Sequence, residues 1–156
     1  MPARSFLFAV PVVTLLAAVA GLATGRAVAE SDLDRLTPVD IGEYRTDSTE
    51  FGGVFFRTPD GRACAIHAGD GPAGCDAVPM DAPEGTNQVR VTSTEVARYV
   101  VSAAPIFTSP GGAKVLPEGH RLTLENITCG VGFQGTVSCE AGAHGFTIAA
   151  TYGVLH

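Results

Sequence analysis

Residues 54–67, Val-Phe-Phe-Arg-Thr-Pro-Asp-Gly-Arg-Ala-Cys-Ala-Ile-His, decide the fold class of this chain. Their first part, Val54 to Arg57, is rich in residues that favour β-strands. Thr58-Pro59-Asp60-Gly61 supplies the turn, because proline fixes φ and glycine accepts a left-handed backbone. Arg62 to His67 has the pattern of a return strand, so the whole stretch predicts a β-hairpin.

Further strand patterns follow, separated by turns that contain glycine or proline. Asn87–Thr92 and Thr136–Glu140 are short and β-prone, and the alternation from Phe146 to Tyr152 predicts the most amphipathic strand of the chain. Thr92–Ser102 is ambiguous, because its start fits a helix capping box whereas Tyr99-Val100-Val101 favours a strand.

A further strand is predicted at Arg121–Glu125, where Leu122 and Leu124 alternate with polar residues. We expect it to run on to Cys129 through a bulge, because Ile127 and Cys129 fall out of register with the two leucines. Short strands at near-regular spacing predict an all-β fold, a small antiparallel sandwich or barrel-like domain.

The chain has four cysteines, Cys64, Cys75, Cys129 and Cys139. Four cysteines allow three different pairings. Each of the two short intervals, Cys64 to Cys75 and Cys129 to Cys139, contains glycines that can reverse the chain and bring its cysteines onto neighbouring antiparallel strands. Local pairing also closes the smallest loops. We therefore expect Cys64–Cys75 and Cys129–Cys139, with pairing between the two halves as the alternative. Structural zinc prefers cysteines two to four residues apart, and none are so spaced.

An apolar run from Phe6 to Leu22 follows Arg4 and leads to Ala27-Val28-Ala29, which fits the small-residue pattern of a signal-peptidase site. This predicts a helical signal peptide over residues 1–29, cleaved before Glu30. The alternative is an uncleaved helix that anchors the chain in the membrane, because the run is only just short of a bilayer span. Either way, the remainder works outside the cytoplasm, and disulfides suit that location.

The part that follows the signal peptide is short enough for one domain. Residues 30–50 are polar and are expected to form a leader, and residues 51–156 the disulfide-stapled β domain. Removal of residues 1–29 takes away Arg4 and Arg26 and no acidic residue, so the formal net charge falls from −6 to −8. That charge repels phosphate backbones, which argues against nucleic-acid binding. The membrane is a partner only if the N-terminal segment is retained.

No catalytic, cofactor-binding or metal-binding constellation stands out. The four histidines are at least twelve positions apart in the sequence: His67, His120, His144 and His156. Three acids of one loop lack the alternating oxygen ligands of a calcium-binding loop: Asp76, Asp81 and Glu84. We therefore expect no catalytic residue, no cofactor and no metal.

The stretch Phe56 to Ile66, with the pattern F-x-T-P-x-G-x-x-C-x-I, and the following Gly74-Cys75 resemble a recurrent pattern in uncharacterised exported proteins of actinobacteria. Cys129, Cys139 and Gly145-Phe146 are similar to the C-terminal part of the same proteins. The resemblance implies an envelope or secreted location and a β fold with two disulfides. It brings no assigned activity, so it implies no role for any individual residue.

These observations favour a secreted or envelope-associated, non-catalytic binding module. The expected partner is an envelope or extracellular protein or a small ligand, and the glycine-rich stretch 68–86 is the first candidate contact surface. The alternative is a small secreted hydrolase that uses His67 or His144. It requires a pocket in which a histidine lies beside a carboxylate or a serine.

Overall fold

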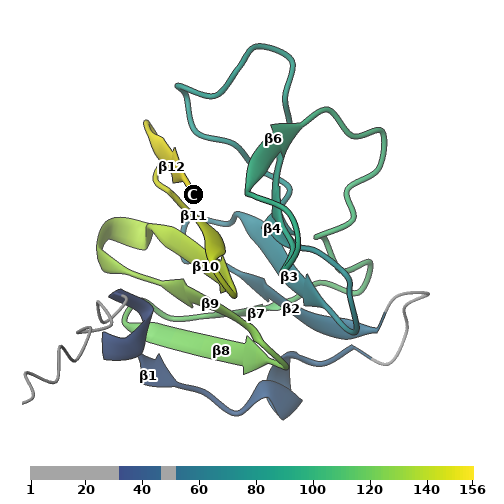
Figure 1. Ribbon diagram of the computed structural model, residues 1–156. Helices are drawn as coiled ribbons and strands as arrows, with labels where there is room; N and C mark the ends of the chain where they lie inside the picture. Colours follow the sequence, from purple (N-terminus) through teal and green to yellow (C-terminus); the bar gives the residue numbers. More distant parts are fainter. Residues whose placement is uncertain (1–31, 47–51) are drawn as a thin grey trace, which may run out of the picture.

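The computed structural model describes residues 32–46 and 52–156, which form two facing β-sheets (Figure 1). Each sheet has six strands, and these ranges contain no α-helix, so the predicted all-β sandwich is confirmed. The predicted signal peptide lies outside the described residues. Within the described ranges, no helix is both long and apolar enough to cross a membrane.

The strands of each sheet come from both parts of the chain. Sheet A has the order β1 (Thr37–Pro38), β8 (His120–Leu124), β9 (Ile127–Val131), β10 (Val137–Ala141), β11 (His144–Ile148) and β12 (Gly153–Leu155). Sheet B has the order β6 (Arg98–Val100), β5 (Gln88–Val91), β4 (Ala73–Cys75), β3 (Ala63–His67), β2 (Gly53–Arg57) and β7 (Lys114–Val115). Three short 3-10 helices complete the described structure: η1 (Asp32–Arg35), η2 (Ile41–Tyr44) and η3 (Phe133–Gly135).

The topology of β7–β12 repeats that of β1–β6. Strands β2 to β6 form one run of antiparallel neighbours, and β8 to β12 form the other. The first strand of each half, β1 or β7, belongs to the sheet of the other half. Thus β1 pairs in parallel with β8, and β7 pairs in parallel with β2. The exchange ties the two sheets together, because neither sheet is complete without a strand from the other half of the chain.

The two disulfides occupy equivalent places at the centre of the sheets. Cys64 and Cys75 are directly opposite on β3 and β4, and Cys129 and Cys139 are directly opposite on β9 and β10. The Cα atoms of the two pairs are 4.0 and 4.1 Å apart, and both bridges match the predicted pairing. No cysteine in the described ranges is free.

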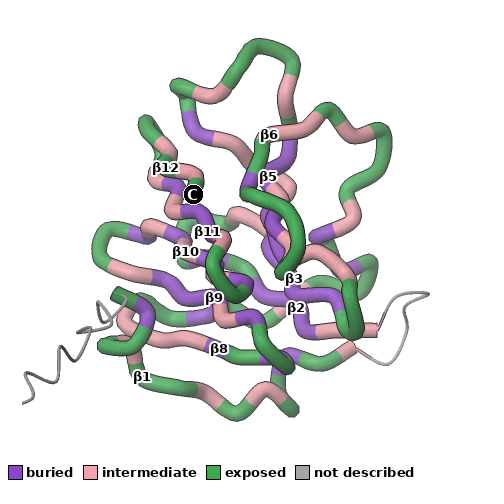
Figure 2. The backbone as a smooth tube through the Cα atoms, viewed as in Figure 1, coloured by how far each residue is buried: buried purple, intermediate pink, exposed green. Residues whose placement is uncertain are grey.

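Each disulfide is flanked in register by large apolar side chains, and together they form the middle of the core. The row in sheet B is Phe56, Cys64, Cys75 and Val89, and the row in sheet A is Leu122, Cys129, Cys139 and Phe146. All belong to one buried cluster between the sheets. Figure 2 shows buried residues along the strands of both sheets. Burial of each large side chain contributes about 1.5–3 kcal/mol.

The predicted hairpin over 54–67 is confirmed as β2 and β3, joined by the turn at Thr58 to Gly61. The predicted bulge before Cys129 is wrong. The chain instead reverses at Glu125, whose φ is 55°, and Leu124 pairs with Ile127 across this turn. Ile127 and Cys129 are out of step with the leucines because they lie on the next strand.

The structure also decides the predictions for the stretches 146–152 and 92–102. The amphipathic pattern that starts at Phe146 ends at Ile148, because the chain reverses through a bond from the Ala149 N–H to the Tyr152 carbonyl. The ambiguous stretch 92–102 contains strand β6. Its start nevertheless makes a helix-like cap without a helix, since Thr92 Oγ1 accepts the Glu95 N–H at 3.0 Å.

The β domain includes residues 32–46, ahead of the boundary at Phe51 that the sequence analysis expects. These residues are polar overall, but they contain well-spaced apolar side chains that reach the sheets. Leu33 and Tyr44 are buried, and β1 extends sheet A. The stretch expected as a leader therefore supplies an edge strand and part of the core.

We predict that the double variants Cys64→Ala/Cys75→Ala and Cys129→Ala/Cys139→Ala each lower the free energy of unfolding by about 3 kcal/mol. The two losses should be similar, because the bridges span 11 and 10 residues and lie at equivalent places in the sheets. Denaturant unfolding monitored by circular dichroism measures both. A variant that keeps the stability of the wild type would contradict the structural role of its bridge.

Candidate functional site

The outer face of sheet B is covered by residues 102–113, which we call the cover segment. Phe107 is fully buried there and packs with Phe55 and Ala65. Its ring lies over Gly74, where a Cβ atom would come within 2.5 Å of the ring and 2.1 Å of the Val89 carbonyl oxygen. Only glycine leaves room for this contact, so the sequence of β4 permits the cover segment to dock.

The cover segment is held by polar side chains of β5 and by Asp76, which directly follows β4. The Asp76 carboxylate accepts the Phe107 N–H at 2.9 Å and the Thr108 hydroxyl at 2.7 Å. The amide of Gln88, itself buried, donates to the Ala104 carbonyl at 2.8 Å. Arg90 donates to the Ser102 hydroxyl at 3.0 Å. The cover segment is therefore bound by hydrogen bonds to its main chain and to two of its hydroxyls, and by one inserted aromatic ring.

His67 is part of the same packing. It is 5% exposed, its ring meets Phe55 edge-on at 5.5 Å and Phe107 at 5.6 Å, and its Nε2 lies 3.0 Å from the Ile106 carbonyl oxygen. Burial lowers the pKa of His67 below its usual value; Arg90 acts in the same direction, and the Ile106 carbonyl and Asp76 oppose them. The ring is thus held in place in its neutral form.

A pocket of about 110 Å³ beside His67 is lined by no hydroxyl, thiol or carboxylate side chain: its lining is His67, Ala68, Gly71, Pro72 and Ile106. It therefore offers this histidine no nucleophile. His144 begins β11 in sheet A, whereas His67 ends β3 in sheet B, so the two candidates for hydrolysis lie on different sheets. In the described ranges no three histidine, cysteine or acidic side chains are grouped as a metal site requires.

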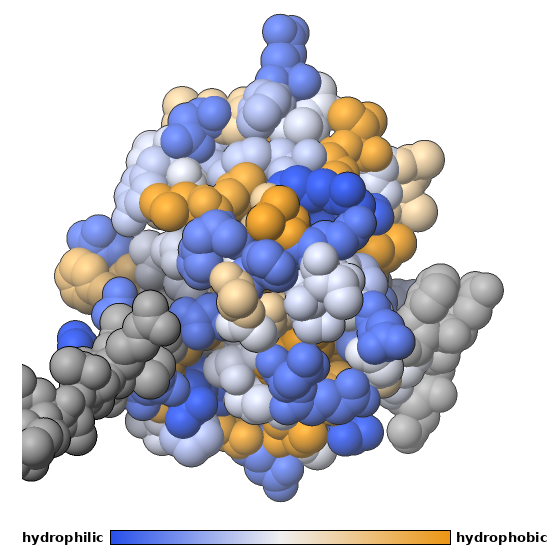
Figure 3. Space-filling view, in the orientation of Figure 1, coloured by the Kyte–Doolittle hydropathy of each residue, from blue (hydrophilic) through white to orange (hydrophobic). Residues whose placement is uncertain are grey.

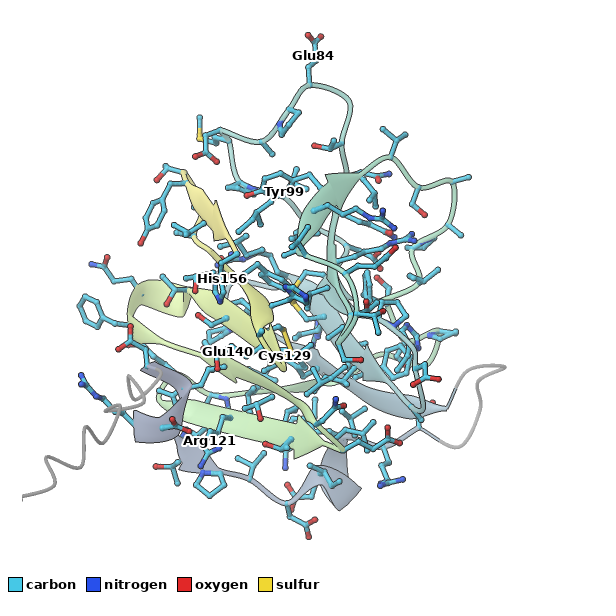
Figure 4. The ribbon with its side chains drawn as sticks, viewed as in Figure 1. Glu84, Tyr99, Arg121, Cys129, Glu140 and His156 are labelled. Atoms are coloured by element: carbon cyan, nitrogen blue, oxygen red, sulfur yellow. A yellow bond between two sulfur atoms is a disulfide. The ribbon has the colours of Figure 1, made fainter. Side chains whose placement is uncertain are left out.

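The stretch 68–86 is partly structural. It contains Cys75 and the buried strand β4, and Asp76 holds the cover segment. Asp81 accepts the Gly153 N–H at 3.3 Å, and Glu84 lies at the exposed tip of the loop (Figure 4). The three acidic side chains of this loop therefore contact different parts of the structure and do not form one site.

The outer face of sheet A carries an open groove of about 460 Å³, which we call the sheet A groove. Its floor is formed by Ser138 and Thr147, whose hydroxyls are 2.7 Å apart across β10 and β11. One wall is η1, and the other is the loop before β10. The complete lining is Asp32, Leu33, Arg35, Leu36, Gly132, Phe133, Gln134, Thr136, Ser138, Thr147 and Tyr152.

Aromatic side chains stand on the rim of the sheet A groove. Phe133 is 75% exposed and Tyr152 is 49% exposed. The surface seen in Figure 3 is mostly hydrophilic, with its hydrophobic groups in separate patches. Because exposed aromatic rings at a concave site often mark a contact surface, these two identify the groove as the candidate functional site.

Sequence reasoning did not find this site. Tyr152 stands at the end of the last predicted strand pattern, and Phe133 lies between Gly132 and Gly135 in a glycine-rich loop. An isolated aromatic in such a loop is a usable signal, because it has few neighbours against which to pack. The floor residues carry no comparable signal, since alternating hydroxyls occur on any solvated strand face.

No protein-family model, curated protein or solved structure matches this chain significantly.

We predict that Asp76→Ala lowers the free energy of unfolding by about 2–3 kcal/mol, because it leaves several donors of the cover segment and β5 without their acceptor. Asp81→Ala is the matched control, since the exposed Asp81 accepts one long bond, and its cost should stay below about 0.5 kcal/mol. Denaturant unfolding of the two variants gives the comparison. Equal losses would show that Asp76 does not hold the cover segment.

The lowered pKa of His67 predicts a loss of stability in acid. The unfolded chain takes up this proton near pH 6.5, while the folded protein resists it, so stability falls as the pH drops through 6.5 and continues to fall until the folded pKa is reached. His67→Gln should reduce this slope between pH 7 and pH 5. Parallel pH profiles of unfolding for the two proteins would contradict the neutral, buried state of His67.

Proposed function

We propose that this protein is a secreted or envelope-associated, non-catalytic binding module that recognises its partner through the sheet A groove. The observation that carries the proposal is the difference between the two outer faces. Sheet B is sealed by the chain's own cover segment, whereas sheet A keeps a concave site with two exposed aromatic rings.

The location outside the cytoplasm is supported by the two disulfides, which fit an oxidising compartment. It is also supported by the apolar run and the small-residue cleavage pattern ahead of Glu30. With the signal removed, the protein is acidic, which favours neutral or basic partners over nucleic acids and anionic lipids.

A rigid site suits recognition. The floor of the groove lies on β10 and β11, which are flanked by the Cys129–Cys139 bridge and by the core. Its geometry is therefore fixed before a partner binds, so little conformational entropy is lost on binding. The histidine pocket on sheet B carries no group that would make a catalytic partner for His67, so we do not extend the proposal to hydrolysis.

The double variant Phe133→Ala/Tyr152→Ala should weaken retention of envelope components by about tenfold or more, because exposed aromatic rings at the centre of a contact carry much of its energy. Val96→Ala/Val101→Ala is the matched control, since both valines are well exposed and neither lines the groove. Quantitative retention on the immobilised protein measures the effect. Equal retention by the wild type and the groove variant would overturn the proposed function.

A further inference from the structure

We propose that the sheet A groove binds an extended peptide segment of a partner protein, in the way that the outer face of sheet B binds the cover segment. This inference rests on the proposed function and adds the class of ligand. It follows from the repeated topology, which places the groove at the position that the cover segment occupies on the other sheet.

The strand registers define the correspondence. When Cys75 is matched to Cys139, Gly74 corresponds to Ser138 on the outer face. The next strand in each sheet pairs Gly74 with Arg90 and Ser138 with Thr147. The floor of the sheet A groove is therefore the counterpart of the surface under Phe107.

The acceptor of the cover segment also has a counterpart. Asp76 follows Cys75 as Glu140 follows Cys139, so Glu140 is a half-buried carboxylate at the place from which Asp76 binds a main-chain N–H. Glu140 and His156 come from the same side of sheet A (Figure 4). The His156 ring lies over Gly145, where a Cβ atom would be 2.7 Å from Nε2.

The described residues ahead of β1 form only the beginning of a cover for sheet A. On sheet B, the cover segment leads into β7, and the corresponding residues of sheet A lead into β1. Here Leu33 and Leu36 pack over Gly130, where a Cβ atom would be 2.7 and 2.5 Å from them. Asp32, the first residue of the described structure, already lines the groove.

The proposed processing leaves the rest of this position free. Cleavage before Glu30 leaves two residues ahead of Asp32, which reach at most about 7 Å. The distance from β9 across to β12 is three strand spacings, or about 14 Å. The exported chain is therefore too short to cover its own groove, and a segment from another molecule can occupy it.

The lining specifies the chemistry of that segment. The Ser138 and Thr147 hydroxyls and the Gln134 amide can exchange hydrogen bonds with a peptide main chain. Phe133 and Tyr152 provide apolar walls for one large side chain. Asp32 and Arg35 cancel in charge, and the acidic protein repels anions, so the segment is neutral or basic and carries one aromatic residue.

The test is selection of a phage-displayed random dodecapeptide library on the disulfide-bonded protein as recovered after export. Enriched peptides are synthesised, and their affinity is measured by calorimetry. Ser138→Trp fills the floor of the groove and should weaken binding by about tenfold or more. Thr123→Trp is the control, because Thr123 is exposed on β8, on the same outer face of sheet A as Ser138, but does not line the groove.

A second variant separates loss of the binding site from misfolding of Ser138→Trp. Phe133 is 75% exposed on a loop, so Phe133→Ala leaves the fold intact and should also weaken the selected peptides. The inference is overturned if no peptide is enriched, or if the selected peptides bind both groove variants as well as the wild type. If no peptide is enriched while envelope retention still depends on Phe133 and Tyr152, the ligand class is wrong and the proposed function stands.

Discussion

The exchange of first strands between the two halves is the constraint on which the rest of the structure depends. Because β1 belongs to sheet A and β2 to sheet B, the connection between them must cross from one sheet to the other, and the connection from β7 to β8 crosses back. Residues 32–36, ahead of β1, and the cover segment, ahead of β7, lie on the outer faces of the two sheets. The cover segment ahead of β7 seals sheet B, whereas residues 32–36, the described residues ahead of β1, cover only part of sheet A.

The disulfides reinforce this arrangement from inside. Each bridges the two central strands of its sheet and lies in the common core, so each sheet is fastened at its middle while the exchanged strands fasten its edge. Arg62 adds a link between the sheets, since the turn that carries it belongs to the first half and its side chain donates to the Gly135 carbonyl of the second. A domain of this size has a limited core, and covalent bridges offset that limit.

The sequence was sufficient for the fold class, the first hairpin and the cysteine pairing, because these depend on local turn chemistry and on short loops. It was insufficient where distant segments decide the outcome. The parallel pairings of β1 with β8 and of β7 with β2 involve two-residue strands without a periodic signal. The reversal at Glu125 uses a positive φ that glutamate seldom adopts. The sheet A groove depends on this long-range arrangement, so no local sequence pattern marks its residues.

The central claim is that one outer face is closed by the chain itself and the other is open, and hydroxyl-radical footprinting with mass spectrometry tests it most directly. Phe107 of the cover segment is fully buried against sheet B, whereas Phe133 is 75% and Tyr152 49% exposed. The account predicts rapid oxidation of Phe133 and Tyr152 in the native protein and protection of Phe107 until the protein is unfolded. Oxidation of Phe107 as fast as that of Phe133 would contradict it.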